Sequence, residues 1–570
     1  MADHSADRRM IMLAAMALVV GTGGACGAWI LLKLIATATN LFWFGRLSDD
    51  PAPIAGASLG LAAIMIPVIG SLIVGVMARF GSEKIRGHGI PEAIEAILYG
   101  ESRLSLKVAL LKPISSAISI GSGGPFGAEG PIIMTGGAIG SLFAQCFRLS
   151  AAERKTLLVA GAAAGMTAIF NTPVAAIMLA IEILLFEWKP RSFVPVVVAA
   201  LVAWAWRPLM IGSGPMFSFV AATPEGVWPL GAGLLVGAAV GIEASLLSII
   251  LYRIEDLFHH LPIHWMWWPA IAAVVVGVVG LFDPNVLGAG YASIQTLLDG
   301  SIALRAAMIL LALKALVWLV ALGSGTSGGV LAPLLILGGA AGYTIGNVLP
   351  GDPGFWAMVG MAGIMSGAMR APMTGALFAV ELTAHFDALP LTVVAAGGSY
   401  AISVLMMPRS ILTEKIARRG RHIRQEYTVD PLDLIQARQI MTRDPDVLPG
   451  TMQVADALTF FRQKATHRSY PLVNAEGQLL GVVSRNDALR WQDEEIPPDS
   501  TLADILSDAS QPAAYPESLS GEIADMIITT GNGRIPIVDR ATRRVVGMLS
   551  RQDLLKTRSV YRLAETRRER

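Results

Sequence analysis

The residues with the clearest chemical meaning are glycines, prolines and one acidic residue in two short segments. Gly121 to Gly140 reads GSGGPFGAEGPIIMTGGAIG, and Gly323 to Gly342 reads GSGTSGGVLAPLLILGGAAG. In each segment a glycine-rich turn precedes a proline, Pro131 or Pro333. Proline is favoured in the first turn of a helix, where its missing N–H costs nothing. Both segments therefore predict a helix that begins inside an apolar stretch.

A helix start of this kind can bind an anion. Its unpaired N–H groups carry about half a positive charge, worth roughly 0.3 to 1 kcal/mol per anion contact at an exposed site. Two such starts that meet would cradle an anion without a full positive charge, and neither segment contains Lys or Arg. A buried cation would hold the anion too tightly for release. The segments therefore predict an anion-transport site built from backbone amides.

Glu129, in GAEGP, is the single acidic residue of the two segments. A charge at the centre of a bilayer costs roughly 2.5 to 3.5 kcal/mol, and such residues are usually functional. A carboxylate at a helix start can occupy the amides that an anion would use, and protonation removes this competitor. Glu129 is thus predicted to link anion binding to proton binding. The alternative is that it only caps its helix.

A third helix start is predicted at GHGIPE, from Gly87 to Glu92, because Pro91 again stands in a first-turn position. The two glycines permit a close approach of the backbone. This segment could supply a third set of amides, or it could be a surface loop between membrane segments.

Composition places most of the chain in a lipid bilayer. Of its 570 residues 54% are hydrophobic and only 15% are charged. Residues 10 to 407 form long apolar stretches with isolated charges, whereas the chain after Arg409 has the composition of a soluble protein. Many apolar stretches are cut by Gly and Pro. Broken helices are therefore expected, and these usually surround the transport site of a carrier.

Charged residues and cysteines set the expected orientation and exclude some classes. Basic residues flank the end of the apolar part, at Arg418, Arg419 and Arg421, so the C-terminal part is expected in the cytoplasm. The run from Ile11 to Ile35 is read as a retained first membrane helix. A net charge of +1 argues against nucleic-acid binding, and two cysteines exclude a disulfide framework or a thiolate metal site.

The apolar part contains an internal repeat. The two glycine-rich segments align without a gap at an offset of 202 residues, and the segments that end at Glu182 and Glu381 align at 199. Two halves are therefore predicted, at about 54–211 and 228–407. Repeats of this kind in carriers are commonly inverted about an axis in the membrane plane.

A second repeat lies in the soluble part, where ARQIMT…YPLVNAEGQLLGVVSRNDAL and LADILS…IPIVDRATRRVVGMLSRQDLL each predict helix, strand, strand, helix. This pair resembles tandem CBS modules, expected at 437–492 and 493–570 after a linker at 425–436. The resemblance implies that the SRND and SRQD segments contact an adenine nucleotide, through Ser484, Asp487, Ser550 and Asp553. Many such pairs are instead plain dimerisation scaffolds.

GHGIPE, GAEGP and GGVLAP, in this order over a duplicated apolar domain, resemble the three signature segments of the CLC family. The expected fold is an all-α polytopic membrane domain, residues 1–424, with two repeated, inverted halves and broken helices, followed by an α/β tandem CBS domain. The resemblance implies a homodimer with a pore in each subunit, in a bacterial inner membrane, with the CBS modules in the cytoplasm. It implies Glu129 as the external gate and an anion site at His88, Gly89, Ala128, Glu129, Val330, Leu331 and Leu412.

Three positions depart from the usual family pattern. His88 stands where many members have Ser, and its imidazole could contact the anion, add pH sensitivity or turn away. Leu412 stands where a Tyr hydroxyl usually reaches the anion, so an apolar inner gate is expected. Ile183 replaces a second, internal glutamate of the family's exchangers, and an aliphatic side chain cannot relay protons. A relay through Glu182 or water stays open, although a structural role is favoured for Glu182 and Glu381.

The expected function is transmembrane transport of chloride or a similar small monovalent anion, without a required cofactor. Chloride/proton exchange is the alternative to a passive voltage-gated channel, and a carrier for an organic solute is a more remote one. No HExxH metal motif or clear catalytic constellation supports an intramembrane enzyme.

Overall fold

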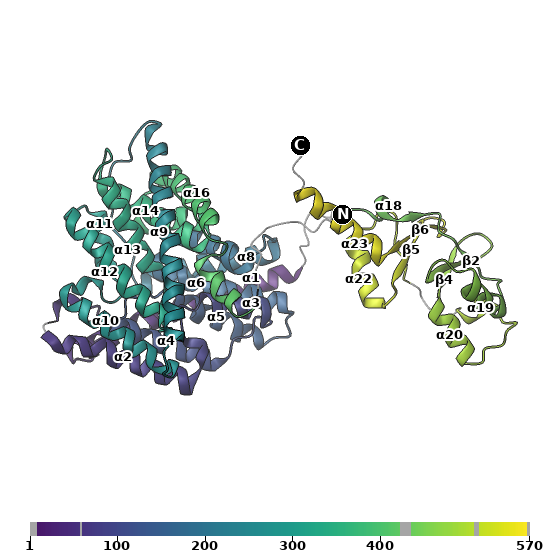
Figure 1. The fold of residues 1–570 in the computed structure, drawn as a ribbon, viewed down its shortest axis with the longest axis horizontal. Coiled ribbons are helices and arrows are strands. Elements are labelled where there is room, and N and C mark those ends of the chain that lie inside the picture. Colours follow the sequence, from purple (N-terminus) through teal and green to yellow (C-terminus); the bar gives the residue numbers. More distant parts are fainter. Residues whose placement is uncertain (1–7, 58–59, 422–431, 433–434, 507–511, 567–570) are drawn as a thin grey trace. The chain divides into compact units, whose positions relative to one another are not determined.

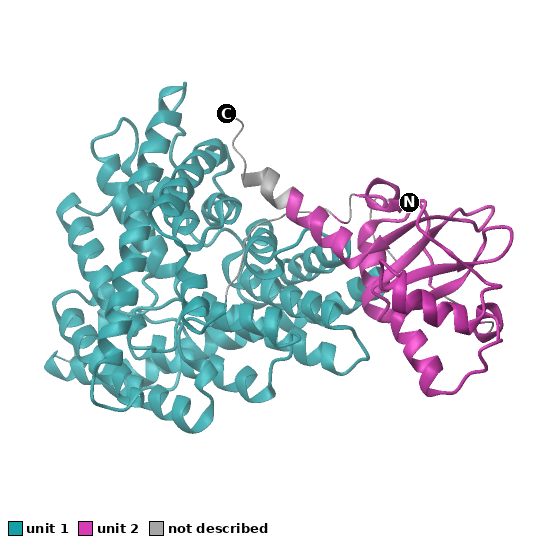
Figure 2. Ribbon diagram, turned by 45° about the vertical axis from the view of Figure 1, so that its right-hand side comes forward, with its two compact units in different colours: residues 1–426 teal, residues 427–570 magenta. Residues whose placement is uncertain are grey.

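The computed structural model describes residues 8–57, 60–421, 432, 435–506 and 512–566, with side chains from residue 9 to residue 560 within these ranges. The chain divides into two compact units, Met1–Glu426 and Tyr427–Arg570 (Figure 2). The linker expected at 425–436 lies largely outside the described residues.

The first unit is a bundle of helices of very different lengths (Figure 1). Its first eight α-helices are α1 Arg8–Phe44, α2 Met65–Val76, α3 Ile90–Tyr99, α4 Leu106–Gly121, α5 Glu129–Gln145, α6 Ala151–Phe170, α7 Pro173–Leu179 and α8 Pro190–Met210. The next nine are α9 Trp228–His259, α10 Trp268–Phe282, α11 Tyr291–Leu298, α12 Leu304–Gly323, α13 Leu331–Gly346, α14 Pro353–Met369, α15 Pro372–Thr383, α16 Leu389–Met406 and α17 Ile411–Arg418.

The helices of the two halves correspond one to one, from α1 and α9 through α8 and α16. The correspondence includes the packing, because α1 lies against α6 and α8 just as α9 lies against α14 and α16. The first half therefore extends back to α1, beyond the start near residue 54 that the sequence repeat suggested. The repeat was not visible there because α1 and α9 share length and apolar character rather than a motif.

The halves hold each other through reciprocal helix caps. The carboxylate of Glu182 accepts hydrogen bonds from the backbone N–H groups at the start of α15, and Glu381 does the same at the start of α7. The donors are Met373 and Thr374 (3.1 and 2.8 Å) for Glu182, and Val174 and Ala175 (3.0 and 2.7 Å) for Glu381. Equivalent groups exchanging equivalent bonds require an approximate twofold axis between the halves.

Helix ends in this unit follow local rules. Ser150 caps α6 in a capping box with Glu153, and Asp352 caps α14. The equivalent helices α6 and α14 both end at a residue in the left-handed conformation, Asn171 (φ 59°) and Arg370 (φ 59°). These ends let the chain reverse directly into the prolines that begin α7 and α15.

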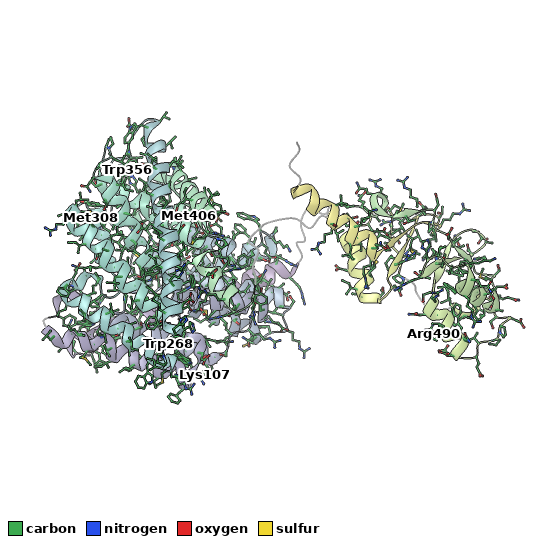
Figure 3. All side chains as sticks on the ribbon, viewed as in Figure 1. Lys107, Trp268, Met308, Trp356, Met406 and Arg490 are labelled. Atoms are coloured by element: carbon green, nitrogen blue, oxygen red, sulfur yellow. The ribbon has the colours of Figure 1, made fainter. Side chains whose placement is uncertain are left out.

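Seven segments among the described residues are long and apolar enough to cross a bilayer: Arg9–Phe44, Gly60–Gly81, Pro190–Met210, Trp228–His259, Trp265–Phe282, Leu304–Gly323 and Phe386–Arg418. Figure 3 shows the Met308 and Met406 side chains at the surface of this bundle, where they are 45% and 42% exposed. Trp356 packs against the start of α9 and Trp268 against its end, so aromatic side chains mark both ends of that helix.

The second unit contains two small sheets with helices. Strands β1 Thr442–Arg443, β6 Val545–Ser550 and β5 Arg534–Val538 form one sheet, and β2 Leu448–Pro449, β3 Ser469–Val473 and β4 Leu479–Ser484 form the other. The helices are α18 Ala437–Ile440, α19 Val454–Gln463, α20 Arg485–Asp493, α21 Leu502–Ile505, α22 Ser520–Thr530 and α23 Arg551–Thr566. Strand β1 lies near the start of the first module but pairs with β6 of the second, so the two modules form one unit.

Candidate functional site

The glycine-rich loops that precede α5 and α13 meet in the interior of the first unit. The backbone N–H of Gly329 donates to the carbonyl of Gly127 at 3.0 Å, which makes an antiparallel bridge between the two loops. The loop before α3 joins them, because the N–H of Gly328 donates to the carbonyl of Gly87 at 3.4 Å. The starts of α3, α5 and α13, which are far apart in the sequence, therefore meet at one buried site.

This convergence requires glycine at specific positions. A Cβ on Gly130 would lie 1.9 Å from the carbonyl oxygen of His88 and 3.3 Å from Cα of Gly329. A Cβ on Gly127 would lie 2.0 Å from Oε2 of Glu129. Real side chains do not approach so closely, so the glycines allow both the backbone contact and the position of the carboxylate.

The Glu129 side chain is fully buried at the first turn of α5. Its Oε1 accepts a hydrogen bond from the Tyr291 hydroxyl at 3.4 Å, while its Oε2 is buried without a hydrogen-bond partner among the described residues. The backbone amides of Glu129 itself and of Ala332, in α13, also interact favourably with the carboxylate. A carboxyl group thus lies between the starts of α5 and α13, where both helix dipoles favour its ionised form.

Other residues predicted for the anion site lie around the same loops. Ala128 and Val330 are the N-caps of α5 and α13, and Leu331 is the first residue of α13; all three are buried. Gly89 is the N-cap of α3 with φ of 89°, a left-handed conformation that favours glycine. The amides expected to hold an anion are therefore at helix starts.

His88 and Leu412 are both inside the protein. His88 is 3% exposed, and its Nδ1 has no hydrogen-bond partner in the part of the chain that the structure describes. Leu412, in the first turn of α17, is fully buried. Beside it, Tyr252 of α9 donates its hydroxyl to the carbonyl of Ile411 at 2.5 Å, a contact that the sequence did not suggest.

Two fully buried lysines correct the expectation of a site without full positive charges nearby. Lys112 of α4 and Lys314 of α12 lie nine residues before Gly121 and Gly323, and so just outside the glycine-rich segments. Each ammonium group donates to two carbonyls in a loop before a short helix: Ile85 and Gly87 (2.8 and 2.7 Å) for Lys112, and Val286 and Gly288 (2.8 and 2.9 Å) for Lys314. Lys314 also interacts electrostatically with Glu129.

The direct contacts of these lysines stabilise the two loops. Their hydrogen bonds to carbonyl oxygens fix the backbone before α3 and α11, with Ser327 as a further acceptor for Lys112 at 3.0 Å. Carbonyl oxygens partly offset the charge of each ammonium, so the cations add positive potential without making a direct contact that would trap an anion.

A polar cavity of about 920 Å³ lies at the α17 end of the unit. The buried carboxylate of Glu92 pairs there with Lys415 and Arg419 at 3.1 and 3.0 Å. Burial alone would lower the pKa of the Arg419 guanidinium, but Glu92 and Glu95 raise it above its ordinary value. This ion-pair cluster joins α3, which follows the His88 loop, to α17, which carries Leu412.

Neither Ile183 nor Glu182 provides a free carboxylate for an internal proton relay. Ile183 is fully buried. Both oxygens of Glu182 are engaged at the start of α15, where Oε2 also accepts from the Thr374 hydroxyl at 2.6 Å. These contacts favour the structural role for Glu182 and its counterpart Glu381.

In the second unit, the residues proposed for nucleotide contact cap helices. Ser484 and Asp487 bond each other at 2.6 Å and cap α20, and Ser550 and Asp553 do the same at the start of α23. One carboxylate oxygen of each Asp is thereby occupied. The same local structure in both modules explains the SRND and SRQD motifs without a ligand.

Fold and site together define a polytopic membrane protein with duplicated broken helices that start at a common buried place. The model of the voltage gated chloride channel family matches residues 69–404, and the CBS domain model matches residues 437–494 and 496–559. The chain belongs to the voltage gated chloride channel family, and the predicted fold class, a CLC-type membrane domain with a CBS pair, is confirmed.

The relatives agree with this assignment. A ClcB-like protein of Ralstonia nicotianae is 28% identical over 403 residues, which are 66% of this chain and 91% of the relative. The H(+)/Cl(-) exchange transporter ClcA of Vibrio cholerae is 28% identical over 381 residues, 63% of this chain and 80% of the relative. Relatives such as ClcA are described as transporters, not as enzymes.

Two solved structures share the fold. A slow cyanobacterial Cl-/H+ antiporter superposes with a TM-score of 0.63 at 22% identity, covering 73% of this chain and 99% of that one. A eukaryotic CLC transporter gives 0.59 at 20% identity, covering 96% of this chain and 98% of that one. The multi-pass membrane architecture predicted from the apolar stretches is thus that of the family.

Proposed function

We propose that this protein transports chloride, or a similar small monovalent anion, across the membrane through the place where α3, α5 and α13 begin. The observation that carries the proposal is the buried Glu129 carboxylate between the starts of α5 and α13, a negative group in a position that suits a dehydrated anion. Protonation of Glu129 removes its charge and frees the helix starts for the anion. Anion movement and proton binding are then linked at one residue.

We propose exchange of chloride for protons rather than a passive channel. The relative ClcA is an H(+)/Cl(-) exchange transporter, and Glu129 provides the proton-binding group on the anion route. Since Ile183 and the engaged Glu182 offer no free internal acid, we propose that protons reach Glu129 from that side through water.

A pH gradient tests the choice between exchange and a channel. With the purified protein in liposomes and equal chloride on both sides, we expect the zero-current potential to move away from zero when a pH gradient is imposed. An exchanger couples the two ions, so the proton gradient drives chloride. A potential that stays at zero at every pH gradient, while chloride current persists, would support a channel instead.

The proposal extends to the assembly and its location. We propose a homodimer with one anion route in each subunit, in a bacterial inner membrane. Arg418, Arg419 and Arg421 follow the last apolar helix, and the positive-inside rule then puts the CBS pair in the cytoplasm.

An adenine nucleotide on the CBS pair would give the cytoplasm control of transport. Asp487 and Asp553 each use one oxygen for the cap. The second oxygen of Asp487 also accepts from Arg490 at 3.1 Å, and a carboxylate oxygen with a remaining lone pair can still accept a ribose hydroxyl. We expect ATP, ADP or AMP to raise the melting temperature of the full-length protein, and Asp487→Asn with Asp553→Asn to abolish that shift. No change with any of the three nucleotides would leave the pair as a scaffold.

A further inference from the structure

Two departures from the internal repeat face each other at the site. The position equivalent to Glu129, at the offset of 202 residues, is Leu331. The position equivalent to Tyr291, at the offset of 201 residues between GHGIPE and GAGYAS, is Ile90. Each polar residue thus occurs in one half only, and the two belong to different halves. The structure joins them, with the Tyr291 hydroxyl 3.4 Å from Oε1 of Glu129.

The surroundings of Tyr291 otherwise follow the repeat closely. Tyr291 is the first residue of α11 and Ile90 is the first residue of α3. Each follows a left-handed glycine N-cap, Gly290 with φ of 73° and Gly89 with φ of 89°. Each of these loops is also held by an equivalent buried lysine that donates to two of its carbonyls.

The repeat therefore acts as an internal control. The loop before α3 adopts the same conformation with an aliphatic side chain in the equivalent place, so the fold does not need a hydroxyl there. The hydroxyl of Tyr291 is therefore best explained by its contact with the Glu129 carboxylate, which lies between the starts of α5 and α13.

The Tyr291 side chain is placed so that it can position the Glu129 carboxylate. Tyr291 is partly exposed and lines a cavity of about 720 Å³, while its hydroxyl reaches the fully buried carboxylate. The Phe217 ring packs beside the phenol, with 6.3 Å between the ring centroids. A hydroxyl can donate to the ionised carboxylate and can accept from the protonated one.

We infer that Tyr291 is a positioning residue for the gate: its hydroxyl holds the ionised Glu129 carboxylate between the starts of α5 and α13. This inference rests on the proposed function, because it assigns a partner to the same gate. Lys314 of α12 is the charged group that interacts with Glu129 on the Tyr291 side. On the α3 side, the converging loop brings His88 and the buried Lys112.

Tyr291→Phe tests the inference, because it removes the hydroxyl and keeps the ring. The ionised carboxylate loses a donor, so Glu129 should accept a proton at higher pH. In liposomes we expect the pH of half-maximal chloride flux to rise by about 0.5 to 1 unit, with the maximal flux within about twofold of the wild-type value. Tyr343→Phe is the matched control, since that hydroxyl donates to the carbonyls of Gly300 and Ile302 and should not affect the profile.

The double variant separates a gate role from a structural one. In a Glu129→Gln background the hydroxyl has no ionised carboxylate to hold, so adding Tyr291→Phe should change nothing further in the pH profile. An unchanged profile in Tyr291→Phe, or an equal effect in both backgrounds, would overturn the inference while the proposed gate stands. If Glu129→Gln keeps the full pH dependence, both the proposed gate and the role of Tyr291 fall.

Discussion

Replacing Glu129 by Gln is expected to leave chloride flux in place and to remove its dependence on pH. Gln has the shape of the protonated acid and cannot ionise, so the helix starts of α5 and α13 stay open to the anion at every pH. Flux from liposomes between pH 4 and pH 8 measures this directly. Wild-type flux should fall toward high pH, where Glu129 ionises and competes, whereas the variant should stay flat. Proton movement should be lost in the variant, because the amide of the substituted side chain cannot bind and release the proton as the Glu129 carboxylate does.

A second acid in the membrane domain serves as the control for this variant. Glu243 lies in α9, and both of its carboxylate oxygens are buried without a hydrogen-bond partner among the described residues, but it lies outside the three converging loops. Glu243→Gln should therefore keep the wild-type pH profile and proton coupling. Persistent pH dependence in Glu129→Gln, or its loss in Glu243→Gln, would contradict the role given to Glu129.

Local patterns in the sequence predicted the helix starts well. Proline after a glycine-rich turn predicted that α5 and α13 begin close to Pro131 and Pro333, and they begin at Glu129 and Leu331. These predictions work because a helix start is decided within a few residues, by the φ restriction of proline and the freedom of glycine.

The buried lysines were missed although a signal existed. Lys112 and Lys314 are 202 residues apart, which is the offset of the two glycine-rich segments. The repeat therefore begins at least nine residues before each glycine-rich segment. Reading the segments alone suggested a site without nearby cations. A charge that backbone carbonyls partly offset can lie close to an anion route, and only the three-dimensional path of the loops shows that arrangement.

The partners of the predicted residues could not be read from the sequence. Tyr291 meets Glu129 across 162 positions, and Tyr252 meets Ile411 across 159, with no shared motif. Such contacts depend on how whole helices cross, which local propensity does not encode. The role of Glu129 could be predicted from its own position in the sequence. Its partner, Tyr291, could be identified only from the fold.

Gly130, which allows the three loops to converge, is expected to be required for chloride flux. In Gly130→Ala the new Cβ would lie 1.9 Å from the carbonyl oxygen of His88. This distance is too short, so the loops before α3 and α5 must separate. Alanine favours a helix over glycine by about 1 kcal/mol, so α5 itself should not suffer. In enzymes a misplacement of about 1 Å can cost about 100-fold in rate, and we expect chloride flux to fall by a similar factor.

Gly397→Ala is the matched control, because this glycine lies in α16 and a Cβ there would meet nothing within 4 Å. It should keep wild-type flux and raise the melting temperature slightly. Size-exclusion elution of Gly130→Ala as a single sharp peak would show that the variant folds and that the loss belongs to the site. Normal flux in folded Gly130→Ala would mean that anions do not pass where the three helix starts meet, since that passage cannot tolerate a methyl group pressed against the His88 carbonyl.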